Sequence, residues 1–229
     1  MNEIKNEYRC VTDPAEVKAY LGDSKIVSFD YETAPDDGYR DEDKAALDAA
    51  KSHICTLSLS VKEHTGIMIP VAHKVGPNMS KADFDALLTE FLTDRNIIKV
   101  AHNLSFEAMF SYAKGIVIMP PVYDTIAAAQ MTLKNAYDFR KLSDSGLKKL
   151  AGELCGEPLP SFSSVTDGKH FDELDSADEE TIRYSCADSD FALRLYHIFN
   201  NWFDRFLPKH RFLVEQVESP TAVYLGIMK

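Results

Sequence analysis

Two carboxylates lie close together in the stretch KIVSFDYETAP, which runs from Lys25 to Pro35. Its β-branched and aromatic residues predict a strand. Side chains two residues apart on a strand point to the same face, so Asp30 and Glu32 share a face. Two like charges at this spacing repel, and burying them unpaired is costly. The pair therefore either lies on a solvent-facing strand edge or holds a cation, and residues elsewhere in the chain must decide between the two.

Two further acids complete a candidate metal site. Glu107 falls in the first turns of a predicted helix that follows a short buried strand, and Asp188 lies in the longest predicted helix. If both helices dock on the sheet by their apolar stripes, their acids converge with Asp30 and Glu32 at one end of the first strand. Oxygen ligands without a His or Cys cluster select hard cations, so we expect two divalent ions, Mg²⁺ or Mn²⁺. Two such ions about 4 Å apart can clamp a phosphodiester for hydrolysis.

A tyrosine accompanies the last of these acids. Tyr184 precedes Asp188 by four residues, so the two side chains stack on one face of the helix. A phenol at this position can hydrogen-bond to an attacking water. Because the reference pKa of tyrosine is about 10, we predict that Tyr184 orients the water and does not abstract its proton.

The elements that must position these residues alternate along the chain. After the first strand, alternating or apolar runs predict strands over 53–61, 65–71 and 96–101, and the run VYDTIAAAQMTL predicts a strand leading into a helix. Helix signals include N-caps at Ser80, Asn103 and Ser176, and a final amphipathic helix over about 209–229, bent at Pro220. This order predicts an α/β fold with a mixed sheet flanked by helices.

Composition limits the class of protein. The 229 residues suffice for one large domain, and the net charge of −11 argues against a protein that grips long stretches of phosphate backbone by charge alone. A small nucleic-acid site with metal ions stays compatible with that charge.

The four cysteines are scattered along the sequence, which indicates reduced thiols in a cytosolic protein and argues against a zinc site. The acidic stretch over 36–50 is interpreted as a solvated insertion. We find no signal peptide and no apolar run near the roughly 20 residues that span a membrane.

Three motifs carry a resemblance to a known family. FDYET, HNLSFE and YSCADSDFALRLY resemble the motifs of the DEDD 3′–5′ exonucleases, which have a ribonuclease H-like fold, and Tyr-x-x-x-Asp is typical of the DEDDy subgroup. The resemblance is closest to the proofreading domain of family A DNA polymerases and covers nearly the whole chain. EQVESPTAVYLGIMK resembles the junction with the polymerase module. We therefore expect an exonuclease domain over 1–207, and over 208–229 a helix that starts a polymerase module.

The resemblance implies a role for each acid. Asp30, Glu32 and Asp188 match the residues that hold the first metal, Asp30 also bridges to the second, and Tyr184 matches the tyrosine that positions water. Glu107 stands where the family usually has Asp. Its extra methylene changes reach by about 1 Å, and a misplacement of that size can lower a rate on the order of 100-fold. The expected substrate is a single-stranded or frayed DNA 3′ end, in the cytoplasm of a bacterial or phage-infected cell.

Candidate substrate contacts flank the acids. Thr33 follows Glu32 and could touch the terminal nucleotide through its backbone, and Asn103 occupies the asparagine of the second motif. Leu104 and Phe106 are candidates for wedging between the last bases.

Other polar residues receive a structural interpretation. Lys148 and Lys149 could meet phosphates, but as single surface cations they are interpreted as solvated groups. Asp124 is interpreted as a helix cap, and Asp190 as a structural hydrogen-bonding group.

Two alternatives stay open. Ribonuclease D and related enzymes trim RNA with the same residues, although the polymerase-like C-terminal segment argues against this assignment. Some family A polymerases carry an exonuclease fold that has lost its metals and serves as a scaffold, although in those the acids are usually missing. Here only one acid is altered, and to another acid.

Overall fold

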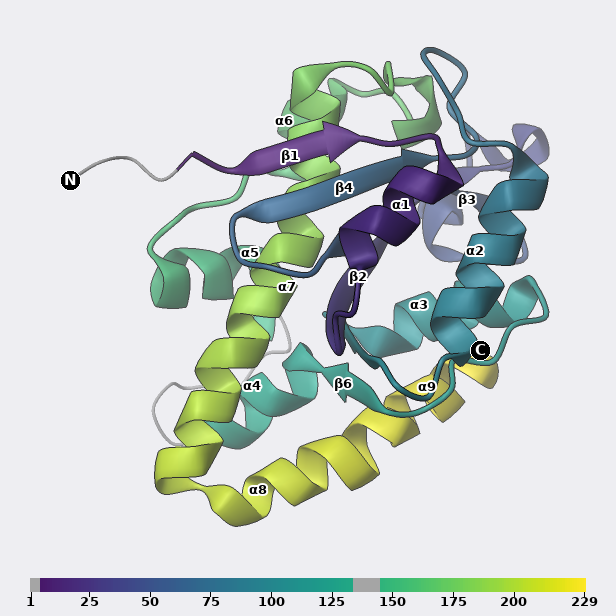
Figure 1. Cartoon of the computed structure of the whole chain (residues 1–229). Helices are drawn as coiled ribbons and strands as arrows, with labels where there is room; N and C mark the ends of the chain where they lie inside the picture. The colour runs from purple at the N-terminus through teal and green to yellow at the C-terminus, as the bar shows by residue number, and fades with distance from the viewer. Residues whose placement is uncertain (1–4, 134–144) are drawn as a thin grey trace.

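The computed structural model describes residues 5–133 and 145–229 and shows one mixed sheet flanked by helices (Figure 1). The described strands and α-helices are β1 (Glu7–Cys10), α1 (Pro14–Leu21), β2 (Ile26–Pro35), β3 (Ser52–Ser60), β4 (Thr65–Pro70), α2 (Lys81–Thr93), β5 (Ile98–Ala101), α3 (Leu104–Ala113), β6 (Val122–Asp124), α4 (Thr125–Leu133), α5 (Leu147–Leu150), α6 (Phe162–Thr166), α7 (Glu179–Phe206), α8 (Pro208–Leu213) and α9 (Ser219–Ile227). The sheet order is β1-β4-β3-β2-β5-β6. The β2–β3 and β3–β4 pairs are antiparallel, and the others are parallel. This architecture confirms the predicted α/β class.

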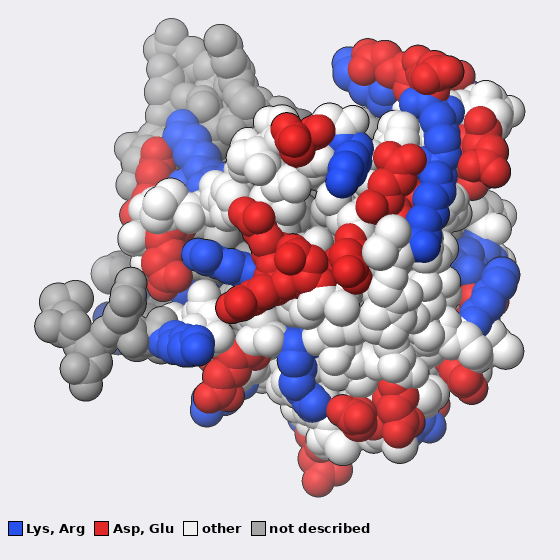
Figure 2. Space-filling model, turned by 90° about the horizontal axis from the view of Figure 1, so that it is seen from above, with Lys and Arg blue, Asp and Glu red and all other residues white. Residues whose placement is uncertain are grey.

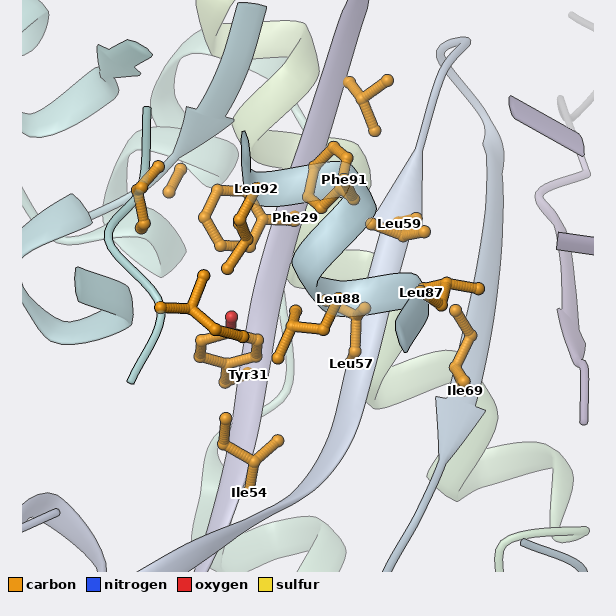
Figure 3. Close-up of a cluster of buried hydrophobic side chains, with 14 of the residues drawn as sticks. Phe29, Tyr31, Ile54, Leu57, Leu59, Ile69, Leu87, Leu88, Phe91 and Leu92 are labelled. Carbon is orange, nitrogen blue, oxygen red and sulfur yellow. The ribbon is translucent and has the colours of Figure 1, made fainter. Parts of the chain in front are cut away.

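Alternation along β2 determines which of its residues enter the main core. Val27, Phe29 and Tyr31 are buried on the face that α2 covers (Figure 3). The rings of Phe29 and Phe91 meet edge to face with their centroids 5.5 Å apart. Ser80 caps α2 as predicted, because its side chain accepts a backbone N–H of the first turn. The core therefore holds β2 rigidly from one side.

The opposite face of the sheet packs against α7, which passes behind β1 and β4 in Figure 1. Gly66 of β4 permits this close approach, since a Cβ at that position would lie 2.9 Å from the Cβ of Cys186. Ser28, Asp30 and Glu32 alternate with the core residues of β2, so they lie on the α7 side. The fold thus places the two acids of β2 beneath a helix that carries a third.

The start of α7 differs from the prediction. Asp178 is the N-cap, and its side chain accepts the backbone N–H groups of Glu180 and Thr181. The predicted cap, Ser176, is wrong because its hydroxyl instead donates to the carbonyl of Pro77. The true cap lies two residues further along the chain.

The start of α3 also depends on a residue other than the predicted one. Asn103 precedes the helix with a φ of 73° and makes no capping bond with its side chain. The carboxylate of Asp124 accepts the N–H groups of Asn103 at 3.1 Å and of Leu104 at 3.2 Å. It also accepts the N–H of Ile126, at 2.9 Å. Asp124 is therefore a helix cap, as predicted, and it serves both α3 and α4.

The C-terminal segment returns to α3. A wide π-helical turn over Val214–Glu218 joins α8 to α9, and Pro220 follows it without the N–H that a regular helix requires there. Helix α9 packs along α3 (Figure 1), and a Cβ at Gly226 would collide with the backbone oxygen of Ser105. The predicted bent helix is thus two helices, of which α9 packs closely on the element that carries Glu107.

The acidic segment between β2 and β3 is mostly exposed, as predicted. It forms two short 3₁₀ turns, Asp37–Tyr39 and Ala45–Leu47. Arg40 ties it to the rest of the domain through an ion pair with the buried Asp172. Among the helices that the structure describes, none is both long and apolar enough to cross a membrane.

Candidate active site

Three carboxylates converge between β2 and α7. Ligand atoms of Asp30, Glu32 and Asp188 all lie within 4.8 Å of one another. Glu32 is buried, whereas Asp30 and Asp188 are partly exposed, so the cluster opens to solvent. A β-bulge follows Glu32, where the pairing of β2 with β3 shifts by one residue. The structure thus brings together three of the four acids that the sequence singled out.

Burial and mutual repulsion disfavour the ionised forms of these three acids. Burial, with the charge of Asp188, raises the pKa of Asp30 well above its ordinary value. Burial also raises the pKa of Glu32, and the charges of Asp30 and Asp188 add to this shift. Burial raises the pKa of Asp188 to about 6. A site that disfavours its own ionised form at neutral pH is one that a bound cation would stabilise.

The fourth acid, Glu107, lies beside this cluster but outside its tight group. Glu107 is 1% exposed, and its Oε2 atom has no hydrogen-bond partner among the described residues. Burial and the charge of Asp30 raise the pKa of Glu107 well above its ordinary value. An unpaired buried carboxyl oxygen is costly, so Glu107 is also in position to gain from a cation near Asp30.

The donor set fits hard divalent cations. Every ligand atom is a carboxylate oxygen, and no other group of three or more His, Cys, Asp or Glu side chains in the described parts of the chain is close enough to hold a metal. Carboxylate oxygens are the ligands that Mg²⁺ and Mn²⁺ prefer. Asp30, Glu32 and Asp188 would hold such an ion, with Glu107 on the side of Asp30.

Tyr184 lies at the edge of the acid cluster with a lysine bound to it. Lys148 of α5 donates a hydrogen bond to the Tyr184 hydroxyl at 2.9 Å, and its ammonium lies 4.6 Å from the ring centroid. Burial and the charges of Glu32, Asp188 and Asp30 raise the pKa of Tyr184 above its ordinary value. The phenol is therefore protonated at neutral pH. Lys148 is half-buried, so its interpretation as a solvated cation is wrong.

The predicted substrate contacts are only partly at the surface. Asn103 is exposed, and its side-chain oxygen accepts a hydrogen bond from Ser105. Phe106 is half-buried with its ring 4.8 Å from that of Phe110. Leu104 is fully buried in the main core, so the structure does not bring it to the surface where a base could meet it. The Thr33 hydroxyl donates to the Ala46 carbonyl at 2.6 Å.

One aromatic residue near the site carried no signal in the sequence. Phe162, in the stretch rich in Pro and Ser before α7, is 44% exposed. Its ring lies 6.2 Å from the Tyr184 ring and 6.4 Å from the Phe171 ring, which is buried beneath it. An exposed ring beside Tyr184 offers a face on which a base can stack. Only its unusual exposure distinguishes it, and exposure is a property of the fold.

Asp190 has the structural role that the sequence indicated. It is fully buried and pairs with Arg194, whose Nε lies 3.2 Å from its Oδ1. It also accepts the Tyr8 hydroxyl at 2.6 Å and the His64 N–H at 2.9 Å. These partners come from β1, from the β3–β4 turn and from α7 itself, so Asp190 fastens β1 and that turn to α7.

The surface charge agrees with a small site. Figure 2 shows acidic side chains gathered near the centre of one face, with separate Lys and Arg side chains around them. The described part of this face has no continuous basic tract. Extended binding of phosphate backbone needs such a tract, so any nucleic acid would engage this face locally.

Comparison with known proteins identifies the same family as the motifs. A family model described as 3′–5′ exonuclease matches residues 8–204. This span contains every acid of the candidate site. No curated protein sequence gives a significant match.

Solved structures share the fold. Brucella melitensis NrnC with bound Mg²⁺ has a TM-score of 0.61 and 20% sequence identity, covering 98% of this chain and 94% of that chain. Trypanosoma brucei RNase D has a TM-score of 0.73 and 15% identity, covering 97% and 73%. The POL domain of Pol1 from M. smegmatis, in complex with a DNA primer-template and dNTP, has a TM-score of 0.66 and 15% identity, covering 96% and 31%. At these identities the likeness supports the fold alone.

Proposed function

The chain belongs to the 3′–5′ exonuclease family, and from that premise we propose that it hydrolyses the terminal phosphodiester at the 3′ end of a single-stranded nucleic acid. One observation carries the proposal. Three carboxylates from β2 and α7 meet within 4.8 Å at a solvent-accessible point, beside a protonated tyrosine. Partly buried carboxylates that repel one another are unfavourable unless bound cations neutralise their charge.

Each acid has a proposed role toward the cations. Asp30, Glu32 and Asp188 would bind the first divalent ion, and Asp30 with Glu107 would face the second. When bound, Mg²⁺ or Mn²⁺ supplies charge neutralisation at the phosphate and acidifies water at neutral pH. The protein contributes the fixed positions of the four carboxylates, because β2, α7 and α3, which carries Glu107, are all packed in the core.

Tyr184 would orient the attacking water. Its raised pKa keeps the phenol protonated, so it acts as a hydrogen-bonding group and not as a base. The water oxygen forms a new bond to phosphorus and the bond from phosphorus to the 3′ oxygen breaks. The departing 3′ oxygen gains a proton, and a nucleoside 5′-monophosphate leaves. The exposed ring of Phe162 and the exposed Asn103 amide are the groups we propose to contact the terminal nucleotide.

We propose DNA as the substrate and proofreading within a family A DNA polymerase as the setting. The support is the three-motif resemblance to the proofreading domains and the match to the exonuclease family model. The domain boundary at residue 207, with a polymerase module beginning after it, is part of this proposal.

RNA is the second candidate substrate. NrnC has been solved bound to pGG, and RNase D shares the fold with a TM-score of 0.73. Each of these structures matches most of this chain, so the fold by itself does not favour DNA over RNA. Hydrolysis of short RNA by the same four acids is therefore the outcome against which the DNA proposal must be tested.

A gel assay separates these candidates. DNA and RNA oligonucleotides of one sequence, labelled at the 5′ end, are incubated with Mg²⁺ or Mn²⁺. We expect a ladder that shortens from the 3′ end, stronger on DNA, and absent in EDTA and in Asp188→Asn. A stronger ladder on RNA would transfer the assignment to RNA trimming. No ladder on either substrate, from folded protein, would favour the inactive scaffold.

A further inference from the structure

Lys148 occupies an unusual position for a lysine in an acidic site. It extends from α5, is half-buried, and bonds to Tyr184 in two ways, by a hydrogen bond of 2.9 Å to the hydroxyl and by its ammonium 4.6 Å from the ring centroid. Its neighbour Lys149 is exposed and has a carboxylate nearby, at 3.9 Å in Glu153. The two lysines therefore have different surroundings although they are adjacent in sequence.

Lys148 faces the acid cluster without pairing with it. Tyr184, whose hydroxyl accepts a hydrogen bond from the Lys148 ammonium at 2.9 Å, lies one helical turn before Asp188 on the same face of α7. Yet no carboxylate oxygen of the described residues lies within 4.0 Å of that ammonium. A cation on the Asp188 side of Tyr184 that forms no ion pair with the described acids can contact a group that enters the cluster.

The chemistry of that group follows from both sides. The carboxylate side would be occupied by divalent cations, and the other side presents an ammonium with three N–H donors, of which Tyr184 receives one. A group held between two sets of positive charges must be an anion. A phosphate meets this requirement, because different oxygens of one phosphate can contact the cations and a lysine at the same time.

We propose that Lys148 is a further catalytic residue, which contacts a non-bridging oxygen of the scissile phosphodiester from the side of Tyr184. This inference rests on the proposed exonuclease function and adds a residue to it. Negative charge grows on these oxygens as water adds to phosphorus, so a fixed ammonium there stabilises the transition state. Because Lys148 also donates to the Tyr184 oxygen, the phenol O–H is left to point toward water or substrate.

The central test compares Lys148→Met with Lys149→Met. Methionine keeps the alkyl chain over the Tyr184 ring and removes the charge, so folding should survive. We expect kcat/KM for single-stranded oligonucleotide hydrolysis to fall about 100-fold in Lys148→Met, the size expected for one fixed donor at a developing charge. Lys148→Arg should recover part of the loss. Lys149→Met should keep wild-type activity.

A binding measurement provides a readout that is independent of turnover. Titration calorimetry with dTMP in Mg²⁺ should show about tenfold weaker binding to Lys148→Met than to wild type, with Lys149→Met unchanged. Thermal unfolding of both variants should match wild type. Unchanged dTMP binding and unchanged kcat/KM in a folded Lys148→Met protein would overturn the proposal.

A double variant distinguishes contact with substrate from an effect through the tyrosine. If Lys148 touches the phosphate, Lys148→Met should still lower kcat/KM when Tyr184 is replaced by Phe. If its effect vanishes in Tyr184→Phe, Lys148 only positions the phenol and the phosphate contact is refuted. Failure of the exonuclease function itself would look different, because the wild-type protein would then cut neither DNA nor RNA.

Discussion

Removing the charge of Asp188 should make the metal-free protein more stable. Burial raises the pKa of Asp188 from 3.8 to about 6. A folded-state pKa above the unfolded-state value means that the folded protein binds this proton more tightly. The resulting stability is present at low pH and is lost as the pH rises through 6. About two pKa units correspond to roughly 3 kcal/mol at pH 8, and Asp188→Asn should recover up to that amount.

Asp190 is a matched control two residues along the same helix. It is also buried, but it is balanced by Arg194 and accepts hydrogen bonds from Tyr8 and His64. Asp190→Asn takes the buried carboxylate partner from Arg194 and leaves it only the more exposed Glu157, at 2.9 Å, so we expect a loss of stability below the about 3–5 kcal/mol of a fully broken buried pair. The same chemical substitution should therefore have opposite effects at the two positions.

Thermal unfolding in EDTA at pH 8 and at pH 5 measures both effects. For a chain of this length, 3 kcal/mol corresponds to a Tm shift of roughly 6–12 °C. We expect Asp188→Asn to raise Tm at pH 8, with a smaller gain at pH 5 where wild-type Asp188 is largely protonated, and Asp190→Asn to lower Tm. A fall in Tm for Asp188→Asn at pH 8 would refute the claim that the acid cluster destabilises the metal-free fold.

Three further predictions concern the cations, the phenol and the support of α3. Mg²⁺ should raise the Tm of wild type, because a ligand at 100 times its Kd stabilises the folded protein by about 2.7 kcal/mol, and it should act far less on Asp188→Asn; equal Tm shifts in a thermal-shift assay would contradict binding at this site. Tyr184→Phe should lower kcat for oligonucleotide hydrolysis about 100-fold with little change in KM, and an unchanged kcat would exclude a role for the hydroxyl. Asp124→Ala, which leaves three backbone N–H groups without their acceptor, should lower the free energy of unfolding by about 2–3 kcal/mol in urea, and a loss below about 1 kcal/mol would show that the cap is dispensable.

The acid cluster could be predicted because its geometry follows from local periodicity. Alternation along β2 puts Asp30 and Glu32 on one face, and a spacing of four puts Tyr184 and Asp188 on one face of α7. Each of these relations holds within a single element, whatever the rest of the fold does. The strands from β2 to β6 could be predicted for the same reason, since their apolar patterns are strong.

Features that depend on contacts between distant segments could not be predicted. The cap of helix α3 is Asp124, which lies at the end of strand β6, so the prediction of Asn103 as the N-cap was misleading. Strand β1 is a short edge element whose four residues are exposed or half-buried in alternation, which gives no apolar pattern. Lys148 meets Tyr184 across 36 residues of chain, and nothing near Lys148 in the sequence indicates that partner.

The supports of α3 also explain how a glutamate can stand at position 107. The helix is fixed by the Asp124 cap, by a hydrogen bond of 2.9 Å between Tyr31 and Ser111, and by the close approach of α9 at Gly226. A helix held at three places cannot retreat to make room for an extra methylene. The adjustment must come from the side chain of Glu107, and no hydrogen bond between its Oε2 and a described residue has to be broken for it. We therefore expect the longer acid to be accommodated by a change of its own rotamer, while the backbone that positions it stays in place.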